Sequence, residues 1–240
     1  MLRNSLVALA PAIMVSSLAM TLVSAESVTQ VSIGARAAIL DRFLAPEQQP
    51  LVSYRAIRRL TASTRGGRMR ASIEAWTTLD PVEGFKYEVI AEEGPAVIRR
   101  RVLIAALEAE RTLTPADAAR AALTPDNYDF LGIQDDLDNL IKDNLIKVDV
   151  RPRRRHVMLV DGSLFVAGGS SDLVRIEGEL SRRPSFWTRK VRIVREYERL
   201  EGVRVPVAMR STADVLIVGP SSFAMTYRYT EINGMKVGGN

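Results

Sequence analysis

Alternating apolar and polar side chains predict β-strands over much of this chain. Between residues 70 and 79 the apolar positions recur every second residue, as in a strand with one buried face. The residues of that face are Ala71, Ile73, Ala75 and Leu79. The alternation returns over 85–92 after a turn at 80–84, and a Gly-Gly turn at 65–68 connects both to a first strand over 51–62. We therefore expect the domain to begin with three antiparallel strands.

The apolar spacing becomes helical in three segments. One helix is predicted over 32–45 and a second over 95–111. The apolar stripe predicted for the second helix consists of Ile98, Val102, Ala105, Ala106 and Ala109. Thr114 is an N-cap residue followed by proline, which predicts a third, short helix that ends near Leu123.

The second half of the chain returns to strands. They are predicted over 145–150, 157–160, 164–167, 173–180, 186–200, 205–217 and 223–229. Asp161-Gly162 is a hairpin signal between two of them. The alternation slips at Ile193-Val194, which predicts a β-bulge there. The fold class is therefore α+β, mainly β: a curved antiparallel meander, with two helices inserted between the third and fourth strands that cover its apolar face.

The first 25 residues predict a secretory signal peptide. Arg3 gives the positive start, residues 6–22 are uncharged and apolar, and Val23-Ser24-Ala25 supplies small residues for cleavage. An uncleaved anchor is the alternative, because the apolar stretch approaches the length of a spanning helix, about 17–25 residues. Residues 26–50 would form an N-terminal helix and linker. Since the chain has no cysteine for lipidation, we expect a soluble, non-lipidated periplasmic protein.

The composition excludes several classes of function. Among 240 residues there is one histidine and no cysteine, which rules out thiol nucleophiles, iron–sulfur clusters and two-histidine metal motifs. Lys and Arg number 33 against 28 Asp and Glu, but the basic residues are spread along the chain, so nucleic acid is not an expected partner. The one dense basic run, over 151–155, could contact a membrane surface or could be a solvated strand end.

Few residues form a candidate catalytic or metal site. His156, the only histidine, lies beside arginines that disfavour its protonation as a general base. Glu74 and Glu88 could pair as carboxylates across the first hairpin, or each could pair with a basic neighbour. A further acidic group lacks the spacing of a calcium loop; it consists of Asp135, Asp136, Asp138 and Asp143. We therefore expect neither enzyme activity nor a metal or cofactor.

The apolar face of the predicted sheet is the stronger signal. Its candidate ligand-lining residues are Ile73, Phe85, Tyr87, Val89, Val191, Ile193, Val207, Met209, Phe223, Met225, Tyr227 and Tyr229. Two are methionines, which adapt to irregular ligands. In the last strand, Arg228 should point to solvent. This face is either a packed core filled by the helices or the lining of a cavity.

Two stretches resemble the LolA/LolB-like superfamily of periplasmic lipoprotein-sorting proteins. One is RMRASIEAWTTLDPVEGFKYEVIAEEGPAVIRRRVLIAALEAER over 68–111. The other, over 159–234, contains VDGSLFV at 160–166, DLVRIEGEL at 172–180, PSFW at 184–187, VRIVREYERLEGVRVPVAMRSTADV at 191–215 and FAMTYRYTEING at 223–234. The resemblance implies that residues 51–240 form an antiparallel half-barrel whose concave apolar face, covered by helices, holds acyl chains.

The sequence thus predicts a non-enzymatic exported carrier or binding protein for a lipid or another long apolar ligand. Its expected partner is a lipid or a lipid-modified protein. The alternative is a structural or interaction module of the cell envelope whose apolar face is filled by its own helices. The space between sheet and helices distinguishes these two functions.

Overall fold

The computed structural model describes residues 34, 37–45, 49–133, 145–183, 188–216 and 219–238. The chain divides into two compact units, residues 1–35 and 36–240, and the sheet and helices below belong to the second. The predicted signal peptide, the PSFW segment and the acidic residues of 135–143 lie outside the described residues.

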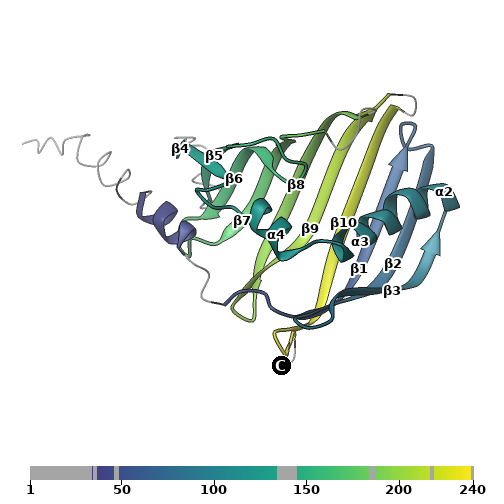
Figure 1. Cartoon of the computed structure of the whole chain (residues 1–240), viewed down its shortest axis with the longest axis horizontal. Helices are drawn as coiled ribbons and strands as arrows, with labels where there is room; N and C mark the ends of the chain where they lie inside the picture. The colour runs from purple at the N-terminus through teal and green to yellow at the C-terminus, as the bar shows by residue number, and fades with distance from the viewer. Residues whose placement is uncertain are drawn as a thin grey trace, which may run out of the picture. The chain divides into compact units, whose positions relative to one another are not determined.

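The second unit is mainly β-structure in one antiparallel sheet of eleven strands. The strands are β1 (Tyr54–Thr64), β2 (Met69–Asp80), β3 (Gly84–Glu93), β4 (Tyr128–Ile133), β5 (Leu145–Pro152), β6 (Val160–Ala167), β7 (Leu173–Leu180), β8 (Thr188–Leu200), β9 (Val203–Val215), β10 (Gly219–Ile232) and β11 (Met235–Lys236). The sheet is open, with β3 and β4 as the two ends of the strand order. The predicted fold class, a curved antiparallel sheet with a few helices, is confirmed (Figure 1).

The strand order differs from a simple meander. It runs β3-β2-β1-β10-β9-β8-β7-β6-β5-β4, so the first strand pairs with the last long strand in the middle of the sheet. The third and fourth strands, which a meander would place side by side, lie at opposite edges. The helical connection between them therefore crosses a face of the sheet (Figure 1). Alternation within a strand reveals its buried face but not its neighbours, which explains this error.

The predicted second helix is present but contains a π-helical turn. It consists of α2 (Ala96–Ile98), the π-helix η1 (Arg99–Ile104) and α3 (Ala105–Arg111). The wider turn shifts the buried stripe by one residue, because π-helical bonds join i to i+5. Ile98, Leu103 and Leu107 are buried against β1–β3, while Val102, which was predicted in the stripe, is 40% exposed.

The two other predicted helices are also present. α4 (Pro115–Ala121) begins with a capping box in which Thr114 and Asp117 satisfy each other's backbone N–H groups. The described part of the N-terminal helix spans residues 37–44, and its Ile39 and Phe43 pack into a hydrophobic cluster with strands β5–β8.

Two local predictions in the second half are wrong. Asp161-Gly162 is not a turn, because both residues lie inside β6. Gly162 pairs with Gly178 of β7, and a side chain there would approach Gly178 Cα to 2.6 Å, so glycine permits close strand contact rather than a turn. The irregularities of β8 fall at 188–191 and 196–197, on either side of the predicted position.

Candidate functional site

The helical segment 96–111 presents a second apolar face, only part of which packs against the core. Val97 and Val102 are 51% and 40% exposed, and Leu113, just after the segment, is 43% exposed. Ala106 and Ala109 continue this face between them. These side chains border open space over β9 and β10, which contains two neighbouring apolar pockets.

The first space, which we name the η1 pocket, has a volume of about 460 Å³. It lies between the start of the helical segment and one end of β1, β9 and β10. Its lining includes Val97, Ile98, Val102, Ala213, Val215 and Phe223. Two arginines, Arg65 and Arg101, also border it.

The second space, the α3 pocket, also has a volume of about 460 Å³. Its lining includes Ala109, Leu113, Met158, Met209, Met225 and Tyr227. From Val215 in the η1 pocket to Pro206 in the α3 pocket, β9 rises about 30 Å at the usual spacing of a strand. Each volume falls within the range of about 300–1,000 Å³ for small-molecule sites.

The structure distributes the twelve sequence-predicted residues between pocket and core. Four of them line the two pockets and also pack in or against the core cluster: Met209, Phe223, Met225 and Tyr227. Six belong to the core cluster between helix and sheet: Ile73, Phe85, Tyr87, Val89, Val207 and Tyr229. Ile193 packs into the β4–β8 cluster, and Val191 is half-buried. Arg228 is exposed, as its alternation with Tyr227 and Tyr229 predicts. Contact with a ligand stays a prediction for all twelve.

A buried arginine near the α3 pocket is not among the residues that the sequence pattern predicted. Arg58 of β1 is 2% exposed and lies on the concave face. Its Nη2 donates to Glu110 Oε1 at 2.8 Å, and Tyr54 Oη accepts a second bond from the same nitrogen. The guanidinium carbon lies 4.9 Å from the ring centre of Phe85 and 4.6 Å from that of Tyr227. The signal was present in the sequence, since position 58 alternates in phase with buried apolar positions of the first strand.

Burial keeps the nearby tyrosines neutral. It raises the pKa of Tyr227 from its ordinary value of 10.0 to about 12, and burial also raises the pKa of Tyr54 and of Tyr229. Burial alone would lower the pKa of Arg58, but the hydrogen bond and charge of Glu110, together with the neighbouring hydroxyls of Tyr227 and Tyr54, raise that pKa. The site thus holds one charged pair among neutral phenols, and Tyr229 Oη donates to Pro206 O at 2.9 Å.

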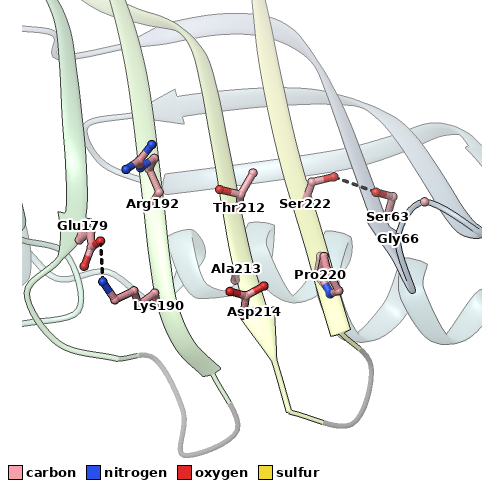
Figure 2. Close-up of a pocket in the computed structure, with 12 residues that line it drawn as sticks. Ser63, Gly66, Glu179, Lys190, Arg192, Thr212, Ala213, Asp214, Pro220 and Ser222 are labelled. Atoms are coloured by element: carbon pink, nitrogen blue, oxygen red, sulfur yellow. Dashed lines mark hydrogen bonds and ion pairs between the residues drawn. The ribbon is translucent and has the colours of Figure 1, made fainter.

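A polar pocket of about 440 Å³ lies by the same strand ends (Figure 2). Its row of side chains follows the strand register from Glu179 through Arg192, Thr212 and Ser222 to Ser63. Ser63 and Ser222 share a hydrogen bond of 2.8 Å between their hydroxyls. Lys190 pairs with Glu179 at 3.4 Å beside this row, as on an ordinary solvated sheet face.

The candidate catalytic side chains of His156, Glu74 and Glu88 bond to or face other groups and do not pair with one another. The Nδ1 atom of His156 accepts from the Met158 backbone N–H at 3.3 Å. Glu74 lies opposite Arg59 in the register, and Glu88 lies opposite Trp76, so the two carboxylates are not direct partners. Within the described ranges, no cluster of three potential metal ligands occurs. Arg153, from the basic run, pairs with Asp129 at 2.9 Å.

No family model and no curated protein matches this chain. Among solved structures, it is similar to a LolA superfamily protein from Nitrosomonas europaea, with 12% identity, a TM-score of 0.36, and coverage of 80% of this chain and 90% of that one. A DUF1329 family protein from Desulfovibrio piger has 10% identity, a TM-score of 0.24, and coverage of 83% and 90%. The first bears the family name that the sequence resemblance indicated. Ligand chemistry therefore has to be inferred from the η1 pocket and the α3 pocket, which together we name the groove.

None of the described helices combines the length and the apolar character that crossing a bilayer requires.

Proposed function

We propose that this protein is a non-enzymatic carrier or binding protein for a long apolar ligand such as an acyl chain. The observation that carries the proposal is the pair of pockets along β9 and β10, each of about 460 Å³, beside a helical segment whose Val97 and Val102 are exposed. A monomeric protein rarely exposes such side chains together unless they meet a partner.

The dimensions suit an acyl chain. One leaflet of a bilayer has a hydrocarbon thickness of about 15 Å, half of the total of about 30 Å. The two pockets together extend along β9 for about 30 Å, so an acyl chain of about 15 Å fits within that span. Burial contributes ~0.8 kcal/mol per CH₂, so a buried chain gains useful affinity without any specific polar contact.

The arrangement of the helix supports the same function. Ile98, Leu103 and Leu107 fix the segment on β1–β3, so the space over β9 and β10 remains beside a stable wall. The methionines Met209 and Met225 line the α3 pocket with unbranched, adaptable side chains. The proposed partner remains a lipid or a lipid-modified protein, and export to the periplasm belongs to the same proposal.

Native mass spectrometry and a pocket-filling variant test the proposal. Protein purified from cells should carry a co-bound lipid mass, and it should bind a fluorescent fatty acid. Ala109→Trp places a large side chain in the α3 pocket and should weaken probe binding about tenfold or more, the equivalent of displacing about two methylenes.

Ala118→Trp is the matched control, because Ala118 is exposed on α4 and lines neither pocket. It should bind the probe like the unaltered protein. A clean apo mass together with no probe binding would contradict the carrier function. That result would favour the alternative, an interaction module that uses the edge strands β3 and β4.

A further inference from the structure

The two pockets differ in charge. Among the residues that the structure describes, no acidic one lines the η1 pocket, whereas two arginines, Arg65 and Arg101, border it. The α3 pocket has one residue of each sign, Glu110 and Arg195. One end of the groove is therefore positive and the other is balanced.

Both arginines are available to a ligand. Arg65 lies in the turn between β1 and β2, and Arg101 lies on η1, so they approach the pocket from opposite walls. Both are exposed, and no ion pair to a described carboxylate involves either of them. Their neighbour Arg99, by contrast, pairs with Glu92.

Hydroxyl groups add hydrogen-bonding capacity at the same end. They belong to Ser211 and to Thr64 and Ser221, whose hydroxyls also share a hydrogen bond of 3.0 Å. Guanidinium groups bind carboxylates and phosphates with charge-assisted, often bidentate hydrogen bonds, and hydroxyls can complete such a site. The apolar lining begins directly beside them, at Val97, Val102 and Phe223.

We infer that the ligand is an anionic amphiphile, whose carboxylate or phosphate head lies between Arg65 and Arg101 and whose chain extends toward the α3 pocket. This inference rests on the proposed function and adds to it the charge and the direction of the ligand. The opposite direction is less favourable for an anionic head, because the α3 pocket is lined by one acidic and one basic residue and Glu110 is already paired with Arg58.

Competition against a neutral probe tests this inference. N-phenylnaphthylamine reports occupancy of the groove, and four competitors share a sixteen-carbon chain: palmitate, palmitoyl lysophosphatidic acid, hexadecanol and hexadecyltrimethylammonium. All are used below their aggregation concentrations. The two anions should compete at least about tenfold better than hexadecanol, and the cation should be the weakest. Their order relative to each other separates a carboxylate site from a phosphate site.

Substitutions at the rim locate the effect. The double variant Arg65→Gln/Arg101→Gln should weaken the affinity for the two anions about tenfold and change the affinity for hexadecanol by less than about twofold. Arg100→Gln is the matched control, because Arg100 is exposed on the same π-helix but does not line the pocket. Raising the salt from about 0.1 M to about 1 M, which shortens the Debye length from about 10 Å to about 3 Å, should reduce the advantage of the anions over hexadecanol.

The outcomes separate this inference from the proposed function. If the neutral probe and hexadecanol bind but the anions gain nothing, the anionic head is wrong while the carrier function stands. Equal losses of anion affinity in Arg100→Gln and in the double variant would also overturn it, since the effect would then come from the overall charge of the protein and not from these two arginines. Absence of all binding would contradict both.

Discussion

At the scale of single residues, Arg58 is the least expected feature of this protein. A charged side chain in an apolar face is expensive to desolvate unless it is paired. Here Glu110 supplies the opposite charge from α3, and the rings of Phe85 and Tyr227 lie against the guanidinium. The pair also joins strand β1 to the helix that walls the groove. Its removal should therefore affect stability more than an ordinary surface pair.

Glu110→Ala should destabilise the fold by about 3 kcal/mol, because it leaves the Arg58 guanidinium buried without its counter-charge. The double variant Arg58→Met/Glu110→Ala should recover much of this loss, since no buried charge remains. Urea denaturation measures both free energies of unfolding. Glu108→Ala is the control: Glu108 also bonds to an arginine and a tyrosine, but near the surface, and its loss should be much smaller. Equal losses for Glu108 and Glu110 would contradict the role of the buried pair.

At the scale of elements, close contact between β6 and β7 depends on two glycines that face each other. Gly162 and Gly178 are register partners, and a Cβ on either would lie within 3 Å of the other's Cα. The backbones can approach closely only because neither residue has a side chain. The requirement belongs to the pair of strands, which is why a turn signal in the sequence was misleading.

Gly162→Ala should cost about 1–3 kcal/mol, since the added methyl must displace the β7 backbone. Thermal and urea unfolding monitored by circular dichroism measure the change. Gly169→Ala makes the same chemical change in an exposed turn where nothing lies within 4 Å, and should stay within about 0.5 kcal/mol. A neutral effect at Gly162 would show that the two strands can move apart freely.

At the scale of the whole sheet, β10 is the connection on which the architecture depends. It pairs with β1 on one side and with β9 on the other, and the strand order contains no other link between β1–β3 and β4–β9. The groove follows the same strand. Loss of β10 would therefore divide the sheet and remove part of the proposed site together.

Truncation after residue 218 should abolish the cooperative unfolding transition, because β1 and β9 both lose the strand that lies between them. Truncation after Gly234 keeps β10 and should retain a cooperative melt, since it removes the short pairing of β11 and the partly buried Val237 but no long strand. Circular dichroism melts and size-exclusion chromatography measure both truncations. A cooperative melt of the shorter chain at the original temperature would contradict the central role of β10.

The sequence by itself determined the local features of this protein. A two-residue period requires only a strand with one covered face, so it correctly separates Tyr227 from Arg228. Thr114 accepts from a helix N–H group three residues away, and the turn over 80–84, where Asp80 accepts from the backbone N–H groups of Val82 and Glu83, is equally local. The signals for these features lie within a few positions of the features themselves, and no distant contact has to be known.

Only the tertiary structure decided the neighbours of each strand and the space between sheet and helix. The β1–β10 pairing joins residues more than 150 positions apart, and any two strands of suitable pattern satisfy the same alternation. Ten of the twelve predicted lining residues pack in or against the core cluster that Leu103 joins, while Val102, one position earlier in the π-helical turn, faces open space. A packed face and an open groove require the same apolar side chains, so only the position of the opposing helix separates them.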